Sequence, residues 1–207
     1  AYEILPSLVG SEMCIRDRTY YVNPETGRDT NDGLTMEFPF ASLIPVNRLD
    51  LNPGDKVLLA RNSVFAGQFL QIRSSGTKEQ PIEIGSYSPE KEEGNPPLIA
   101  ADGQGIWYQD YGTPLDSPTH VYQGYVSSAV LLYDVKHVIL RDLEITNRAS
   151  GVPGESYSAP HKMNRTGVAV VAKDKGTCSG ITLRNLSIHD VNGNVYDKHM
   201  NNGGIYM

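Results

Sequence analysis

The residues of this sequence that are best suited to chemistry lie close together near its C-terminal end. The segment IHDVNGNVYDKHMNNGG, residues 188–204, carries Asp190, Asp197 and His199 among several Asn and Gly residues. Cleavage of a glycosidic bond needs two carboxyl groups about 5 to 9.5 Å apart, one as acid and the other as base or nucleophile. Asp190 and Asp197 are the candidates for that pair.

The same segment also permits a second chemistry, β-elimination beside a uronate carboxylate. That reaction needs a base and a cation, such as Ca²⁺, Arg or Lys, that stabilises the resulting negative charge. His199 or Lys198 is then the candidate base, with Asp190 on a metal. A solvated turn, in which Asp190 only helps to cap a corner, is the structural alternative to both chemistries.

Two irregular segments, residues 102–123 and 149–165, supply the candidate binding residues. Long excursions from a regular scaffold often carry binding sites. The candidate substrate-binding residues are Trp107, Tyr108, Tyr111 and Arg165. The aromatic rings either stack on sugar faces or cover the end or side of the coil, and Arg165 is a candidate for a position in a groove. The remaining histidines have no spacing that fits a zinc site, so no metal ligands are assigned.

The elements that must position these residues are organised around a repeat. VILRDLEITN at 138–147 and ITLRNLSIHD at 181–190 each contain two alternating apolar triplets separated by a polar pair. A repeated pair of short strands joined by a corner is typical of a solenoid coil. Alternation of side chains along a strand predicts which residues of the second copy point inward. These are Ile181, Leu183, Leu186 and Ile188, with Thr182 and Ser187 pointing outward.

Short strands recur along the rest of the chain. They are expected at 19–22, 56–60, 69–72, 82–84, 98–100, 129–132, 167–172 and 203–207, with a short helix within 41–51. Most links between them are too short for the helical crossovers of an ordinary parallel sheet. Asp142 and Asn185 stand at the two corners of the repeat, where a left-handed backbone is needed, and stacked corners could exchange side-chain hydrogen bonds. The pattern therefore predicts an all-β solenoid.

These features resemble the right-handed parallel β-helix superfamily, the pectate-lyase-like fold. YYVNPETGRDTNDGLTMEFPFASL, NPGDKVLL and RSSGTKEQPIEI are similar to the entry segment, capping helix and first coils of secreted bacterial carbohydrate-active β-helix proteins. The resemblance covers residues 19–207. It implies an all-β, right-handed parallel β-helix (β-solenoid) with a short N-terminal capping helix, and it supplies no catalytic motif that transfers residue by residue.

The resemblance also implies what the protein does. A glycoside hydrolase acting on a plant or microbial polysaccharide is the first hypothesis. A polysaccharide lyase with Ca²⁺-assisted β-elimination and a non-catalytic adhesin or carbohydrate-binding scaffold are the alternatives. The expected partner is a polysaccharide or oligosaccharide, and Ca²⁺ is the cofactor expected only of a lyase. By the same resemblance we expect a secreted, cell-surface or periplasmic protein that is a monomer when full length.

Composition limits the other classes of function. The formal net charge of −6 argues against a nucleic-acid partner. The sequence has no run of 18 apolar residues, so no membrane span is expected. Residues 1–18, with SEMCIRDR, resemble a translated sequencing adapter or a leader foreign to the domain, and no export signal is visible there. We expect 19–207 to be the N-terminal part of a single parallel β-helix domain, truncated at the C-terminus. We also expect the 207-residue chain to be poorly soluble or inactive when it is expressed alone.

Overall fold

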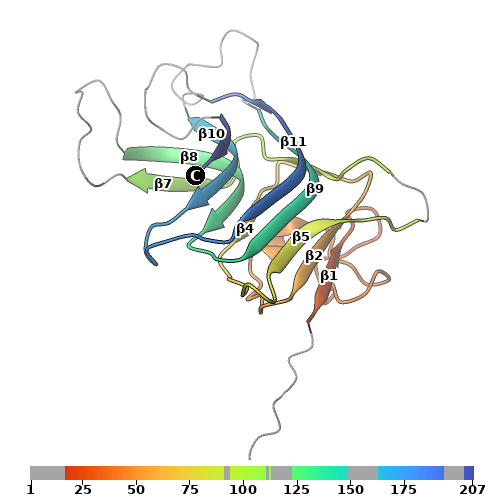
Figure 1. Ribbon diagram of the computed structural model, residues 1–207. Coiled ribbons are helices and arrows are strands. Elements are labelled where there is room, and N and C mark those ends of the chain that lie inside the picture. The colour runs from red at the N-terminus through yellow and green to blue at the C-terminus, as the bar shows by residue number, and fades with distance from the viewer. Residues whose placement is uncertain (1–16, 91–93, 111, 113–122, 149–162, 194–202) are drawn as a thin grey trace, which may run out of the picture.

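A computed structural model describes residues 17–90, 94–110, 112, 123–148, 163–193 and 203–207. Within them the chain forms strands almost throughout, with one short helix (Figure 1). In the part of the chain that the structure describes, no helix is both long and apolar enough to cross a membrane. The prediction of an all-β protein is therefore confirmed.

Among the described residues the first sheet contains seven strands, and every pairing in it is parallel. Its strands are β1 (Thr19–Val22), β2 (Lys56–Ala60), β3 (Val64–Ala66), β5 (Ile82–Tyr87), β6 (Leu98–Ala100), β9 (Val138–Asn147) and β11 (Thr182–Val191). β1, β2, β5, β9 and β11 lie side by side in chain order. β3 and β6 form a second short row that joins the C-terminal half of β9. Each segment of chain therefore returns to pair with the one before it.

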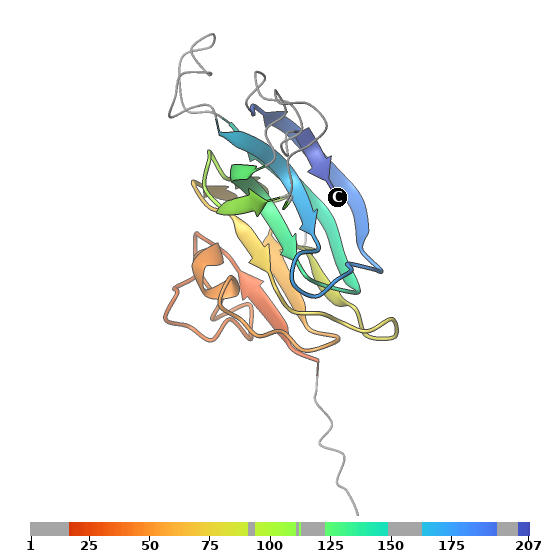
Figure 2. The ribbon, with the colours of Figure 1, turned by 90° about the vertical axis from the view of Figure 1, so that its left-hand side faces the viewer.

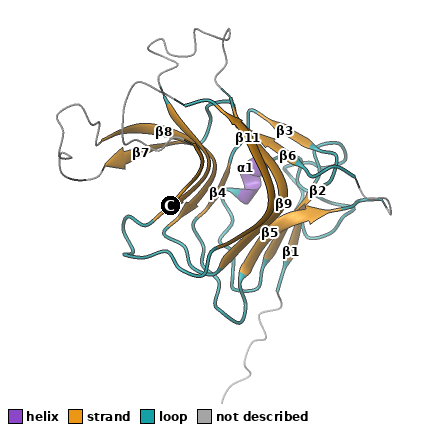
Figure 3. Cartoon of the chain, turned by 45° about the horizontal axis from the view of Figure 1, so that its top comes forward, coloured by secondary structure: helices purple, strands orange, loops and turns teal. Residues whose placement is uncertain are grey.

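The second sheet contains five strands in the part of the chain that the structure describes. They are β4 (Leu70–Ile72), β7 (Ile106–Asp110), β8 (Gln123–Tyr133), β10 (Asn164–Val171) and β12 (Gly203–Tyr206). β4, β8, β10 and β12 are parallel neighbours, whereas β7 runs antiparallel to β8. Figure 3 shows the two sheets curving around a common interior, from which the β7/β8 hairpin projects.

The predicted pairing of the two repeats is confirmed. In β9 and β11, Leu140 lies opposite Leu183 and Leu143 lies opposite Leu186. The corner residues Asp142 and Asn185 both have a left-handed backbone, with φ of 56° and 50°. The Asn185 side-chain amide donates to the Asp142 carboxylate over 3.0 Å, which is the predicted corner hydrogen bond.

The interior is apolar, and it is sealed more completely in the middle of the stack than at one end. The β9 residues Leu140, Leu143 and Ile145 are fully buried, whereas their β11 counterparts pack on the same cluster but stay partly exposed. The helix α1 (Leu43–Val46) and β1 lie at the opposite end of the stack (Figure 2). The inward orientation predicted for the apolar residues of the repeat is thus confirmed.

Two expectations differ from the structure. The helix predicted within 41–51 is only one turn long, with Ser42 as its N-cap and Pro45 inside the first turn, where a missing N–H is tolerated. The segment 102–123 is not irregular throughout, because β7 lies within it and pairs with an extended β8. This pairing joins strands that are separated by residues 111–122, and no short turn signal in the sequence announces it.

Candidate active site

The candidate active site lies where β9 and β11 end side by side. His189 stands opposite Thr146, and its imidazole Nε2 lies 2.9 Å from a carboxylate oxygen of Glu144 two residues back along β9. Its Nδ1 lies 3.2 Å from a carboxylate oxygen of Asp190. The same oxygen of Asp190 forms an ion pair with the guanidinium of Arg148, just beyond β9. We call Glu144, Arg148, His189 and Asp190 the charged cluster.

Asp190 is presented by a backbone irregularity. The register of β9 and β11 slips between His189 and Val191, so that Val191 instead of Asp190 lies opposite Asn147. Asp190 has a φ of 51°, which is uncommon for a residue other than glycine. A bulge of this kind re-aims a side chain and is frequent beside active sites. The Asp190 side chain is 49% exposed, so its carboxylate is accessible to a ligand.

The charges of the cluster support one another. The hydrogen bond from Arg148, followed by that from His189, holds the pKa of Asp190 below its usual range. Hydrogen bonds to Glu144 first and to Asp190 second raise the pKa of His189 above its ordinary value. A protonated His189 donates from both ring nitrogens, which satisfies both carboxylates. Asp190 is therefore held as a carboxylate.

A buried asparagine fixes the position of the cluster on the scaffold. Asn147, the last residue of β9, is fully buried. Its Oδ1 accepts from the backbone N–H of Gly103 over 2.9 Å, and its Nδ2 donates to the carbonyls of Ser127 over 3.1 Å and Thr166 over 3.0 Å. One side chain thus joins the end of β9 to β8 and β10, directly beside Arg148. Sequence reasoning missed it, because an Asn at a strand end predicts a turn.

Arg165, the predicted substrate-binding arginine, is largely buried. It lies in β10 and is only 4% exposed. Its guanidinium donates to the carbonyls of Asn192 over 3.1 Å and Met163 over 3.3 Å, and burial lowers its pKa. The arginine therefore supports the backbone that follows Asp190.

The predicted aromatic residues divide between the two faces of the β7/β8 hairpin. Trp107 packs against Leu131, Ala169 and Val171 on the outer side of the second sheet, and its Nε1 donates to Ser128 Oγ over 2.8 Å. Trp107 therefore covers the scaffold, which is one of the two roles predicted for these aromatic residues. Tyr108 is on the opposite face and is exposed.

Three predicted site residues lie outside the described residues: Tyr111, Asp197 and His199. Their predicted roles stay predictions, as does the role of Lys198. Within the described part of the chain, no group of three or more His, Cys, Asp or Glu side chains is arranged to hold a metal ion.

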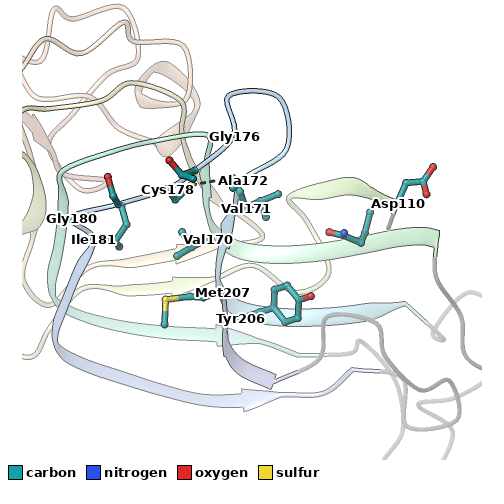
Figure 4. A pocket seen from close by; sticks show the side chains of 13 residues that line it. Asp110, Val170, Val171, Ala172, Gly176, Cys178, Gly180, Ile181, Tyr206 and Met207 are labelled. Carbon is teal, nitrogen blue, oxygen red and sulfur yellow. Dashed lines mark hydrogen bonds between the residues drawn. The ribbon is translucent and has the colours of Figure 1, made fainter. Parts of the chain in front are cut away.

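A cavity of about 670 Å³ lies away from the charged cluster, beside the end of β10 (Figure 4). Its walls include Val170, Ile181, Tyr206 and Met207. Cys178 also lines it, and its Sγ lies 3.3 Å from the carbonyl of Val171. The walls are mainly apolar and carry no pair of carboxylates among the described residues, so this cavity does not have the chemistry of a glycosidase centre.

Comparison with known proteins points to one kind of enzyme. The chain is 63% identical to the GH136 lacto-N-biosidase from Eubacterium ramulus and matches its crystal structures with a TM-score of 0.83, over 91% of this chain and 30% of that one. It is 40% identical to a lacto-N-biosidase of Bifidobacterium longum subsp. longum over 209 residues, which are 91% of this chain and 13% of that protein. The chain is therefore a homologue of a segment of these glycoside hydrolases, and it spans less than a third of their length.

A more distant likeness concerns the fold alone. A rhamnogalacturonan lyase matches with a TM-score of 0.50 and 17% identity, over 83% of this chain and 37% of that one. No protein-family profile matches the sequence.

Proposed function

We propose that this chain carries part of a glycoside hydrolase that cleaves an oligosaccharide, specifically a lacto-N-bioside. The observation that carries the proposal is the 63% identity to a lacto-N-biosidase across 91% of the chain. The accessible carboxylate of Asp190 supplies a group that such a reaction requires. By the family resemblance, the enzyme would work outside the cell or at its surface.

The alternative functions have less support. The likeness to a lyase is limited to 17% identity and therefore concerns only the fold. The two relatives at 40% and 63% identity are both lacto-N-biosidases, which are enzymes, so they do not support a non-catalytic scaffold. The hydrolase hypothesis is thus preferred to both the Ca²⁺-assisted lyase and the adhesin.

The fold proposed for the whole domain is a right-handed parallel β-helix. In support, β2, β5, β9 and β11 stack in parallel and in chain order, and so do β4, β8, β10 and β12. Parallel connections between strands are right-handed in nearly all proteins. The corner hydrogen bond from Asn185 to Asp142 joins two successive turns of chain, which is compatible with stacked coils.

The proposed mechanism uses Asp190 and Asp197 as the two carboxyl groups. One protonates the leaving oxygen, and the other attacks the anomeric carbon or activates a water molecule. The charged cluster favours the ionised form of Asp190, which a nucleophile or base requires. Glu144 takes no direct part in this scheme: it anchors His189, which in turn contacts Asp190.

Hydrolysis of a chromogenic lacto-N-bioside tests this function, with the chain assayed both alone and within its complete gene product. We expect Asp190→Asn and Asp197→Asn each to lower kcat at least about 100-fold, because each removes a group that transfers a proton or attacks. Asp50→Asn, at an exposed aspartate far from the cluster in sequence, is the matched control and should be silent. Full activity in Asp190→Asn, or a complete gene product that releases no sugar, would overturn the proposal.

A further inference from the structure

The face of the β7/β8 hairpin opposite Trp107 carries an exposed pair of tyrosines. Tyr108 lies directly opposite Tyr125 in the antiparallel register, so both side chains point to the same face. Tyr108 is 41% exposed and Tyr125 is 64% exposed. Their ring centroids are 5.2 Å apart with an interplanar angle of 71°, an edge-to-face contact that fixes each ring against the other. We call this pair the tyrosine platform.

Two polar side chains lie beside the platform, at the next pair of opposed residues on the same face of the hairpin. Asp110 lies opposite Gln123, and both side chains are exposed. One carboxylate oxygen of Asp110 accepts the backbone N–H of Gly112 over 2.7 Å, which leaves acceptor capacity on the carboxylate. The amide of Gln123 offers both a donor and an acceptor. An aromatic surface with hydrogen-bonding groups at one edge results.

The opposite face of the hairpin is anchored, which keeps the platform in place. Trp107 packs on the second sheet, and its indole N–H is bonded to Ser128. Val126, next to Tyr125, is fully buried. The platform thus stands on a packed support, and a ligand would meet rings that are already ordered.

The chemistry of this face selects among ligands. The ring faces carry negative charge density that attracts the C–H groups of a sugar, while sugar hydroxyls match the carboxylate and the amide at the edge. The described residues of this face are Ile106, Tyr108, Asp110, Gln123 and Tyr125, and none of them is a cation. Among these five residues an anionic ligand, such as a uronate chain, would meet the carboxylate of Asp110 and no cation. A neutral sugar is the class that fits.

The platform is also joined to the candidate active site. β8 continues from Tyr125 to Ser127, whose backbone carbonyl accepts from Asn147. Asn147 directly precedes Arg148, the ion-pair partner of Asp190. The hairpin and the charged cluster therefore adjoin the same buried asparagine.

We infer that the tyrosine platform, Tyr108 and Tyr125 with Asp110 and Gln123 at its edge, binds a neutral sugar unit of an oligosaccharide. The proposed function supplies only the choice of probe, because sugar stacking needs no catalysis. The platform is distinct from the carboxylates that would cleave the substrate.

Binding of lacto-N-biose to the 207-residue chain, measured by calorimetry and by saturation-transfer NMR, tests this inference. Irradiation of the aromatic protons should saturate the C–H protons of one sugar face. Tyr125→Thr, which keeps a strand-forming residue, should weaken binding about three- to tenfold, and Tyr125→Phe should retain most of it. Phe38→Ala removes an aromatic side chain that is 62% exposed elsewhere, and it is the control that should change nothing. Fluorescence of Trp107, the single tryptophan of the chain, confirms that each hairpin variant is folded.

Several results would overturn the inference. Unchanged affinity in Tyr125→Thr would show that the platform does not bind the sugar. Equal binding of a glucuronate disaccharide would show that it does not select neutral sugars. A chain that dimerises in light scattering and becomes monomeric in Tyr125→Thr would assign this face to self-association. Binding and turnover are measured separately. Binding without hydrolysis would contradict the proposed enzyme activity and support the platform. Hydrolysis in a parent whose Tyr125→Thr variant binds equally well would support the activity and contradict the platform.

Discussion

At the scale of single residues, Asp190 owes its position to an extra residue in β11. Without the slip between His189 and Val191, the side chain opposite the buried Asn147 would be Asp190 itself, at a place where a carboxylate would be costly to bury. The bulge moves Asp190 to the surface and brings Val191 opposite Asn147. One inserted residue therefore makes the carboxylate accessible while the strand pairing continues.

The titration of His189 reports whether the charged cluster forms in solution. We expect its pKa to lie above the ordinary 6.5, because Glu144 and Asp190 both favour the protonated ring. Glu144→Gln removes the larger contribution and should bring the pKa down, whereas Glu79→Gln, at an exposed glutamate outside the cluster, should leave it unchanged. NMR titration of the imidazole protons measures both. A His189 that titrates identically in parent and Glu144→Gln would show that the contact is absent in water.

This titration also sets the sign of a pH effect on stability. A group whose pKa is raised by folding stabilises the protein fully below its unfolded pKa, and that contribution is lost as pH rises through the folded value. His189 is exposed, so the effect is small. The parent should lose this stabilisation between the ordinary pKa of 6.5 and its higher folded pKa, and Glu144→Gln should lose less.

At the scale of elements, Asn147 is the point where three strands are joined. We expect Asn147→Ala to destabilise the protein by about 2 to 4 kcal/mol, because it leaves the Gly103 N–H and two backbone carbonyls buried without their partner. Asn192→Ala, which truncates an exposed side chain close by, should change the free energy of unfolding by less than about 0.5 kcal/mol. Chemical denaturation of the two variants makes the comparison. Equal effects would mean that the buried network does not hold the strands together.

Some strand pairings could be predicted from the sequence and others could not. The pairing of β9 with β11 was predictable, because alternation with period two and the polar corner occur in both copies. The β7/β8 hairpin was not, since its strands are separated by residues 111–122 and the packing of Trp107 against the second sheet joins residues far apart in the sequence. The bulge at Asp190 was also hidden, because the letters of a strand do not reveal a shift in register. Of the charged cluster, Asp190 was named from the sequence, whereas Glu144 and Arg148 were not, because the pairing of the two repeats brings them to it.

At the scale of the whole molecule, burial changes along the stack of strands. The interior is closed around β9 but opens at β11 and β12, where apolar side chains such as Ile205 are 48% exposed. Equivalent residues of the repeat therefore occupy different environments. Leu143 is fully buried, and Leu186, its partner in register, is only partly buried.

This difference yields a matched pair of substitutions with the same chemistry. Leu143→Ala should destabilise the chain by about 2 to 5 kcal/mol, because it removes a buried side chain and leaves a cavity. Leu186→Ala should have less than half that effect, since water already reaches its side chain and less apolar surface is returned to solvent. Both values come from urea denaturation of the 207-residue chain. Equal losses would mean that β11 is covered in solution as completely as β9, by self-association or by another part of the chain, and a lower molecular mass in Leu186→Ala would then identify self-association as the cover.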